Sequence, residues 1–191
     1  MNISSHAMLY AFGLYNSDSV SKPKVQRVKW KAPPTGFVKI NVDGAFNNVT
    51  KSGGLGFVIR DCTGMVLAGG AYPRQGLISA EHAELLACVM AVEFAIDHHF
   101  YSAFVEMDAQ VVLSQLEITD CPNTSLLGRI YEDLQIKLAT QGCWKFCYIN
   151  RSGNTASHVI AAYAASLHSA EFFFSVPNFL QAVTTAEFCV T

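Results

Sequence analysis

The sequence has little charge and no long uninterrupted hydrophobic run. Only 15% of its 191 residues are charged, while 51% are hydrophobic, and this balance excludes an intrinsically disordered chain. No apolar stretch reaches the roughly 18 residues that a membrane-spanning helix needs, so we expect no membrane association. The apolar N-terminal stretch AMLYAFGLY has no Lys or Arg ahead of it, since the first is Lys22. We therefore expect no signal peptide.

Cysteine pairs at metal-binding spacings are also scarce. Six cysteines are scattered along the chain, and only Cys143 and Cys147 lie close together. A single C-x3-C pair without a second ligand pair is a weak zinc signal. Free thiols indicate a reducing compartment, so we expect an intracellular protein, nuclear or cytoplasmic.

Basic charge is concentrated in one short segment. Residues 22–39 hold six of the 13 Lys and Arg residues, which leaves seven basic against 14 acidic residues in 40–191. Any surface that binds nucleic acid must therefore be local. We interpret residues 1–35 as a lead-in and a basic, proline-containing linker, and residues 36–170 as the folded domain. Residues 171–191 form an apolar tail that packs on the domain or, alternatively, provides a partner surface.

Hydrophobic periodicity predicts five strands and four helices. Alternation or turn signals place strands at 37–43, 54–60, 65–71, 102–107 and 143–149. Helical spacing places helices at 79–98, 109–117, 125–139 and 154–167, the first with Ser79 as its N-cap. A meander followed by helix-linked strands predicts an α/β domain. Its mixed sheet has three antiparallel and then two parallel strands, flanked by helices.

Acidic residues stand at the ends of two of these strands. Asp43 ends the strand KINVD, and Asp108 follows the strand SAFVEM. If the two strands are parallel neighbours, both aspartates emerge at the same edge of the sheet, where sites collect in open sheets. Glu84 lies on or beside the apolar stripe of the first helix, where a carboxylate facing the sheet is costly unless it is neutralised.

A cluster of carboxylate ligands without a His–Cys set favours Mg²⁺ or Mn²⁺ over zinc. Two such ions can activate water and stabilise the leaving oxygen of a phosphodiester. Each acid also has a simpler explanation, because an Asp before Gly is common in turns and an Asp ahead of a helix is a common cap.

Five motifs in order along the chain carry a family resemblance: KINVDGAF, GGLGFVIRDCTGMVL, SAEHAELLACVMAV, FVEMDAQVVL and NRSGNTASHVIAAYA. Together they resemble the ribonuclease H-like superfamily. More specifically, they resemble the plant-type domain related to the RNase H segment of non-LTR retroelement reverse transcriptases. The resemblance covers about residues 28–183 and implies the same five-stranded fold.

This resemblance implies an endonuclease that cuts the RNA strand of RNA–DNA hybrids with two Mg²⁺ or Mn²⁺ ions. Asp43, Glu84 and Asp108 match three of the family's four acids, and His158 occupies the position of the fourth. Asp43 would bridge the ions, Glu84 and Asp108 would hold one, and His158 with Asp43 the other. His158 is alternatively a proton shuttle or a structural residue near the site. We interpret Asn154 as the N-cap of the last helix rather than as a substrate contact.

Substrate contacts are expected near the site, in a protein that we expect to be a monomer. Candidates for binding nucleic acid are Gly44 and Ala45 through their backbone amides, then Asn47, Asn48 and Arg151, with Arg60 and Arg74 as further options. The segment EITDCPNTSLLG, where some relatives carry a basic clamp, has no Lys or Arg. This lack and His158 favour a second hypothesis: a retroelement-derived module that binds nucleic acid or protein with weak or no catalysis.

Overall fold

The computed structural model describes residues 30–118 and 122–188, and its elements follow the predicted order with three additions. The predicted elements are β1 (Val38–Asn47), β2 (Ser52–Arg60), β3 (Val66–Gln75), α1 (Ala80–Asp97), β4 (Ser102–Met107), α2 (Gln110–Leu116), α3 (Gly128–Thr140), β5 (Cys143–Tyr148) and α4 (Thr155–Ala164). The additions are the short 3-10 helix η2 (Arg151–Gly153) ahead of α4, then β6 (Glu171–Phe173) and α5 (Asn178–Phe188), the last two formed by the apolar tail.

One mixed sheet runs through the middle of the molecule in the order β5-β4-β1-β2-β3-β6. Strands β1, β2, β3 and β6 pair in antiparallel fashion, and β4 pairs in parallel with both β1 and β5. The α/β class and the mixed sheet are confirmed. The sheet has six strands rather than five, because the three-residue β6 pairs with the outer edge of β3.

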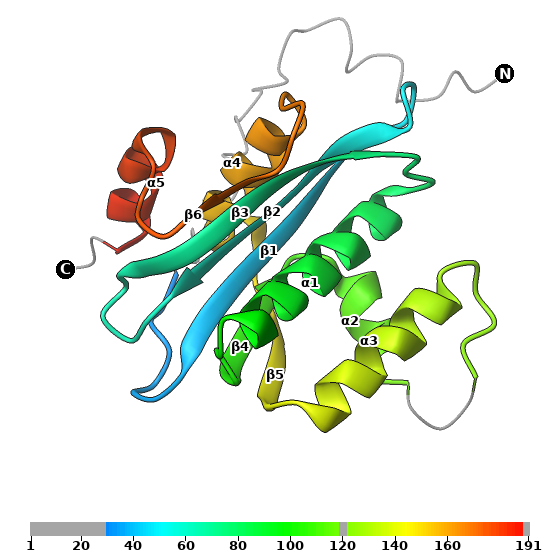
Figure 1. Cartoon of the computed structure of the whole chain (residues 1–191), viewed down its shortest axis with the longest axis horizontal. Coiled ribbons are helices and arrows are strands. Elements are labelled where there is room, and N and C mark those ends of the chain that lie inside the picture. Colours follow the sequence, from blue (N-terminus) through cyan, green and yellow to red (C-terminus); the bar gives the residue numbers. More distant parts are fainter. Residues whose placement is uncertain (1–29, 119–121, 189–191) are drawn as a thin grey trace, which may run out of the picture.

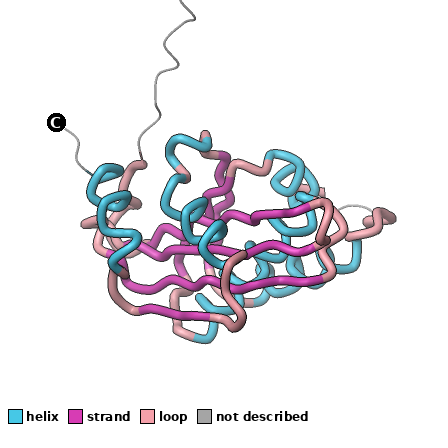
Figure 2. Tube along the Cα trace, turned by 90° about the horizontal axis from the view of Figure 1, so that it is seen from above, coloured by secondary structure: helices cyan, strands magenta, loops and turns pink. Residues whose placement is uncertain are grey.

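Helices cover both faces of the sheet, so the fold has three layers (Figures 1 and 2). Helix α1 crosses one face with α2 and α3 beside it, and its core joins Ile40 and Val42 to Leu85 and Val92. Helix α4 crosses the other face with α5 outside it, around Val58, Ile160 and Leu180. Both faces of β1 are therefore buried, including the one that carries Lys39, Asn41 and Asp43.

Strand β1 is longer than predicted, and this changes the position of Asp43. The strand continues to Asn47 because the β1–β2 hairpin pairs Asn47 with Ser52. Parallel pairing with β4 stops earlier, at Asn41 opposite Glu106. Asp43 thus lies inside β1 and not at its end, but just beyond the point where β1 and β4 separate.

Two local features fix α1 against this part of β1. The Ser79 hydroxyl accepts the amide hydrogen of His82 at 3.0 Å, which confirms the predicted N-cap. A Cβ atom at Gly44 would lie 2.3 Å from the backbone carbon of Ala83. Only glycine allows β1 and α1 to approach this closely, which explains why the aspartate of the DGA motif is followed by glycine.

The described residues continue before the first strand and after the last strand of the sheet. Trp30, ahead of β1, is 3% exposed and lies in the protein interior. Among the helices that the structure describes, none has both the length and the apolar character needed to cross a bilayer.

Candidate metal centre

Three carboxylates from separate elements converge beside the point where β1 and β4 separate. Asp43 comes from β1, Glu84 from α1, and Asp108 from the residue after β4. One oxygen atom from each lies within 4.8 Å of the other two, and this is a group that could hold a metal ion. Asp43 is buried, while Glu84 and Asp108 are partly accessible. The convergence predicted from the parallel strands is therefore present in the fold.

Burial and neighbouring negative charge oppose the ionisation of Glu84 and Asp43. Burial, followed by the charges of Asp43 and Asp108, raises the pKa of Glu84 to about 9. Burial also raises the pKa of Asp43, with a contribution from Asp108 and an opposing hydrogen bond from His158. Glu84 Oε2 accepts one backbone hydrogen bond, from the Gly44 amide at 3.2 Å. A divalent cation would remove this repulsion, so the donor set fits the hard oxygen ligation that Mg²⁺ and Mn²⁺ prefer.

His158 lies against Asp43 and outside the three-carboxylate group. Its Nδ1 is 3.1 Å from Asp43 Oδ2, and its Nε2 is 3.0 Å from Arg151 Nη2. An arginine can only donate, so Nε2 is the acceptor in the shorter Arg151 contact and the ring proton belongs on Nδ1. In this arrangement His158 donates to Asp43 and orients its carboxylate.

Asn154 stands at the N-cap position of α4, but its side chain does not cap the helix. The interpretation of the Asn154 side chain as the cap of this helix was therefore wrong. Asn154 Nδ2 instead donates to the Val42 carbonyl oxygen at 2.9 Å and to Asp108 Oδ1 at 3.3 Å. The side chain thus connects the start of α4 to β1 and to one acid of the cluster.

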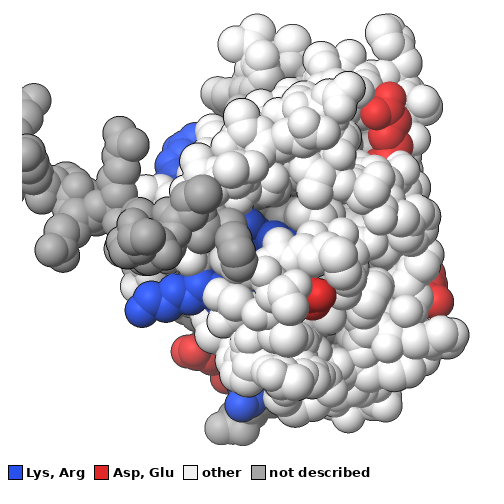
Figure 3. All heavy atoms as spheres, turned by 90° about the vertical axis from the view of Figure 1, so that its left-hand side faces the viewer, with Lys and Arg blue, Asp and Glu red and all other residues white. Residues whose placement is uncertain are grey.

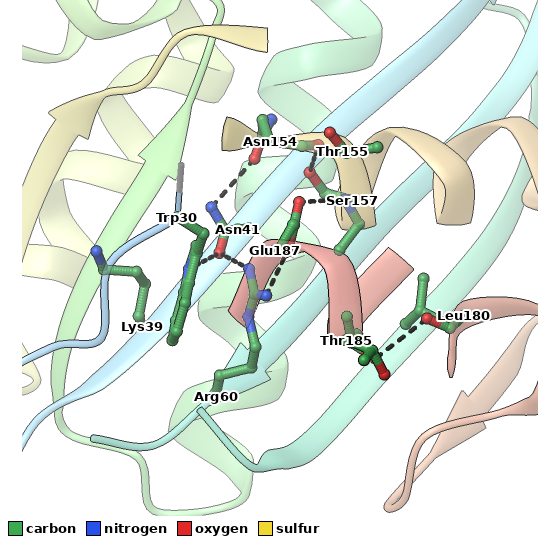
Figure 4. A network of polar contacts seen from close by, with 12 residues as sticks. Trp30, Lys39, Asn41, Arg60, Asn154, Thr155, Ser157, Leu180, Thr185 and Glu187 are labelled. Atoms are coloured by element: carbon green, nitrogen blue, oxygen red, sulfur yellow. Dashed lines mark hydrogen bonds and ion pairs between the residues drawn. The ribbon is translucent and has the colours of Figure 1, made fainter. Parts of the chain in front are cut away.

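Behind Asn154, a buried polar network occupies the α4-facing side of β1 (Figure 4). Asn41 is its centre, because its Nδ2 donates to both Asn154 Oδ1 and Glu106 Oε2, each at 3.1 Å. Its Oδ1 accepts from Trp30 Nε1 at 2.9 Å and from Arg60 Nη2 at 2.7 Å. All four hydrogen-bonding positions of the Asn41 amide are thereby used.

Two ion pairs neutralise the charges of this network. Lys39 Nζ lies 2.5 Å from Glu106 Oε1, and Arg60 Nη1 lies 2.6 Å from Glu187 Oε2 in α5. Arg60 also stacks on Trp30, with its guanidinium carbon 3.9 Å from the ring centroid. Glu106 is thus engaged by Lys39 and Asn41, whereas no Lys or Arg of the described residues forms an ion pair with Asp43, Glu84 or Asp108.

Comparison with known proteins agrees with this geometry. A family model described as "Reverse transcriptase-like" matches residues 41–164, well over half of the chain. The chain belongs to the reverse transcriptase-like family. It is 30% identical over 151 residues to the "Putative ribonuclease H protein At1g65750" of Arabidopsis thaliana, a match that covers 78% of this chain and 24% of that protein. The chain therefore spans about a quarter of the length of this curated relative.

Solved structures show that this reverse transcriptase-like domain has a ribonuclease H fold. RNase H1 from the archaeon Halobacterium salinarum superposes with a TM-score of 0.59 at 26% identity, covering 68% of this chain and 97% of that one. The N-terminal RNase H domain of Rv2228c from Mycobacterium tuberculosis gives a TM-score of 0.58 at 23% identity, over 67% and 92%. The family resemblance drawn from the five sequence motifs is confirmed.

The residues proposed to contact nucleic acid are spread more widely than the acids. In this reverse transcriptase-like domain the Gly44 amide points at Glu84. Asn47 is the exposed last residue of β1, and Asn48 begins the β1–β2 turn. Asn47 Oδ1 accepts from Val49 N, and Asn48 Oδ1 accepts from Lys51 Nζ. Ala45 is partly buried in β1, between Gly44 and this turn.

The arginines separate into distinct groups. Arg60 is 1% exposed and paired with Glu187, so the option of a substrate contact at Arg60 is wrong. Arg74 is exposed near the end of β3, whereas Arg151 lies beside the acids, through His158. On the face drawn in Figure 3, Lys and Arg side chains are few and separated. This fits a local rather than a broad basic surface.

Sequence reasoning did not identify Asn41, Arg60 or Glu187 as supports of the site. Strand alternation puts Asn41 on the same face as Asp43, but its partners come from four distant parts of the chain. The one signal in the sequence was the polar alternation of Lys39, Asn41 and Asp43 in a strand that is buried on both faces. Such residues need buried partners.

Proposed function

We propose that this domain is a metal-dependent endonuclease that hydrolyses the RNA strand of RNA–DNA hybrids. The observation that carries the proposal is the convergence of Asp43, Glu84 and Asp108, whose oxygen atoms lie within 4.8 Å of one another. The membership of the reverse transcriptase-like family and the ribonuclease H fold support it. One solved ribonuclease H with this fold is in complex with an RNA/DNA hybrid, at 19% identity and a TM-score of 0.57.

The three carboxylates would hold one or two Mg²⁺ or Mn²⁺ ions, with His158 beside Asp43. Bound ions would supply a nucleophilic water at neutral pH and stabilise the departing ribose oxygen. The protein holds Asp43 through His158, Asp108 through Asn154, and Glu84 through the Gly44 amide. These hydrogen bonds orient the ligands before any ion arrives, and this preorganisation favours binding and chemistry.

Arg151 is the basic side chain best placed to meet the substrate. It lies in the turn ahead of α4, is exposed, and its guanidinium contacts His158. A phosphate near the acids would be within reach of the same side chain. Asn47 and Asn48 at the β1–β2 turn would extend the contact surface along the hybrid, whose 2′-hydroxyls distinguish the RNA strand.

Cleavage of a labelled RNA–DNA hybrid tests the proposal. Purified protein should cut the RNA strand in Mg²⁺ or Mn²⁺, leave 5′-phosphate and 3′-hydroxyl ends, and lose activity at least 100-fold with Asp43→Asn, a magnitude on the order of losing a metal ligand. Asp133→Asn is the matched control, because Asp133 is exposed on α3 and outside the acid cluster. Equal cutting by Asp43→Asn and Asp133→Asn would refute the assignment.

His158 favours a second candidate function, a domain that binds hybrids without cutting them. An imidazole adds no negative charge and is a poorer Mg²⁺ ligand than a carboxylate. Calorimetry separates the two functions. A binding module should bind hybrid and show no Mg²⁺ or Mn²⁺ site that disappears with Asp43→Asn, whereas a nuclease should show one.

A further inference from the structure

Helix α4 begins beside the acid cluster, and its first turn receives its capping carboxylate from the other end of the domain. Glu187, near the C-terminal end of α5, accepts the amide hydrogen of Ala156 through Oε1 at 3.0 Å. Ala156 is the second residue of α4, and its amide is one of those that a helix cannot satisfy internally. A buried carboxylate at this position also complements the positive end of the helix dipole.

This arrangement explains why the Asn154 side chain is available to the site. An asparagine at the N-cap position ordinarily bends back to accept an amide hydrogen of the first turn. Here Glu187 accepts that kind of hydrogen bond, and Asn154 points to Asp108 and the Val42 carbonyl instead. The capping role that the local sequence predicts for Asn154 is therefore filled by Glu187, which lies 33 positions further along the chain.

The second oxygen of Glu187 fixes the direction of a chain of hydrogen bonds that ends at Asp108. Glu187 Oε2 holds Arg60, and Arg60 with Trp30 donates to Asn41 Oδ1. Because these two side chains only donate, the Asn41 oxygen must face them and its amide nitrogen must face Asn154 Oδ1. Asn154 then has to present its own amide nitrogen to Asp108.

Removing Glu187 would leave the buried Arg60 guanidinium without its charged partner. Arg60 is 1% exposed, and its Nε has no hydrogen-bond partner in the described part of the chain. Burial lowers the pKa of Arg60, and the charge of Glu187 opposes this. Without the Glu187 carboxylate, the guanidinium would have to move toward another acceptor and would pull on Asn41 as it does so.

We propose that Glu187 is a positioning residue for the metal centre. By capping α4 and clamping Arg60, it sets the orientation of Asn154 and, through Asn154, of Asp108. The same cap fixes the register of α4, which carries His158 against Asp43 one turn later. Glu187 and Trp30 both lie outside residues 41–164, the part of the chain that the family model matches. The effect of Glu187 on metal binding rests on the proposed function. The orientation of Asn154 by Glu187 does not require a metal.

The test uses the full chain with Glu187→Gln, which keeps the size of the side chain and removes its charge. The first readout is the side-chain amide resonance of Asn154 in ¹⁵N–¹H spectra of metal-free protein. The second is the dissociation constant for Mn²⁺ from calorimetry. We expect the Asn154 resonance to move and Mn²⁺ to bind about tenfold more weakly, as when other partners behind a ligand are lost.

Two further variants separate positioning from simple loss of charge or of stability. Glu171→Gln removes the same charge from the same C-terminal segment. The Glu171 side chain accepts from the Tyr163 hydroxyl at 2.9 Å on the surface, so this variant should behave as wild type in both measurements. Glu187→Asp keeps the charge but is one methylene shorter, so it cannot hold Arg60 and Ala156 together. It should shift the Asn154 resonance, and it carries the test if Glu187→Gln does not fold.

A purely structural Glu187 gives a different result. Its variants would unfold at lower urea concentration, while the Asn154 resonance and the Mn²⁺ affinity of the folded protein would stay at the wild-type values. That result overturns the inference and leaves the proposed function intact. If wild-type protein binds no Mn²⁺, the proposed function fails, and the Asn154 resonance alone still decides whether Glu187 positions it.

Discussion

Replacing Glu84 by glutamine should stabilise the metal-free protein at neutral pH. Burial and the charges of Asp43 and Asp108 raise the pKa of Glu84 from 4.5 to about 9. A carboxyl group whose pKa is higher in the folded state binds its proton more tightly when folded. The free energy of unfolding therefore falls as pH rises from 4.5 toward 9. The effect is absent below pH 4.5 and complete above pH 9.

The width of this pH window sets the size of the change in the free energy of unfolding. Each pH unit inside it lowers the free energy of unfolding by about 1.4 kcal/mol, so the interval from pH 4.5 to 7 corresponds to about 3 kcal/mol. Glu84 is partly accessible to solvent, which screens the repulsion. We therefore expect Glu84→Gln to gain about 1–2 kcal/mol over wild type at pH 7 and almost nothing at pH 4.5.

Urea unfolding at pH 4.5, 7 and 8.5 in the presence of a chelator measures this difference. The control is Glu93→Gln, the same substitution on the same helix, at an exposed carboxylate paired with Lys137. It should not be more stable than wild type at any of these pH values. Adding Mn²⁺ at pH 8.5 should raise the urea midpoint of wild type and leave that of Glu84→Gln unchanged. Identical pH dependence of wild type and Glu84→Gln would show that burial and the charges of Asp43 and Asp108 do not raise the pKa of Glu84.

Three further substitutions test separate parts of the site. Gly44→Ala would place a Cβ atom 2.3 Å from the backbone of Ala83, so urea unfolding should show a loss of about 3 kcal/mol; a loss below about 1 kcal/mol would contradict the close approach of β1 and α1. His158→Asp should bind Mn²⁺ more tightly in calorimetry and be less stable without metal, because it adds a fourth negative charge; weaker Mn²⁺ binding would oppose this view. Arg151→Ala should weaken hybrid binding and reduce the salt dependence of the logarithm of the binding constant by about one phosphate contact; an unchanged salt slope would remove Arg151 from the interface.

The convergence of the acids could be predicted because it follows from topology. Alternation in KINVD and SAFVEM gives each aspartate its face, and parallel pairing of β1 with β4 brings the two faces together. Glu84 follows from the helical spacing of α1. The length of β1 could not be obtained in this way, because its last residues are strand only through pairing with β2.

The residues that support the site could not be predicted from local patterns, because they and their partners are far apart in sequence. Arg60 pairs with Glu187 across 127 positions, and Asn41 contacts Asn154 across 113. No local pattern distinguishes a buried arginine at the end of a strand from a solvated one. Asn154 was misread for the same reason: its local sequence indicates a cap, and only the tertiary position of α5 makes that cap unnecessary.

The distribution of charge along β1 connects the three converging acids with the buried residues that support them. At the start of the strand, the negative charge of Glu106 is balanced by Lys39 and that of Glu187 by Arg60, each at hydrogen-bonding distance. A few residues later, Asp43 meets Glu84 and Asp108 with no ion pair to a Lys or Arg of the described residues, and the pKa values of Asp43 and Glu84 are raised. Buried charges are tolerated when they are paired. This group of like charges is therefore the exception that a divalent cation would resolve. The balanced network behind it holds Asn154, whose amide nitrogen lies 3.3 Å from Asp108 Oδ1.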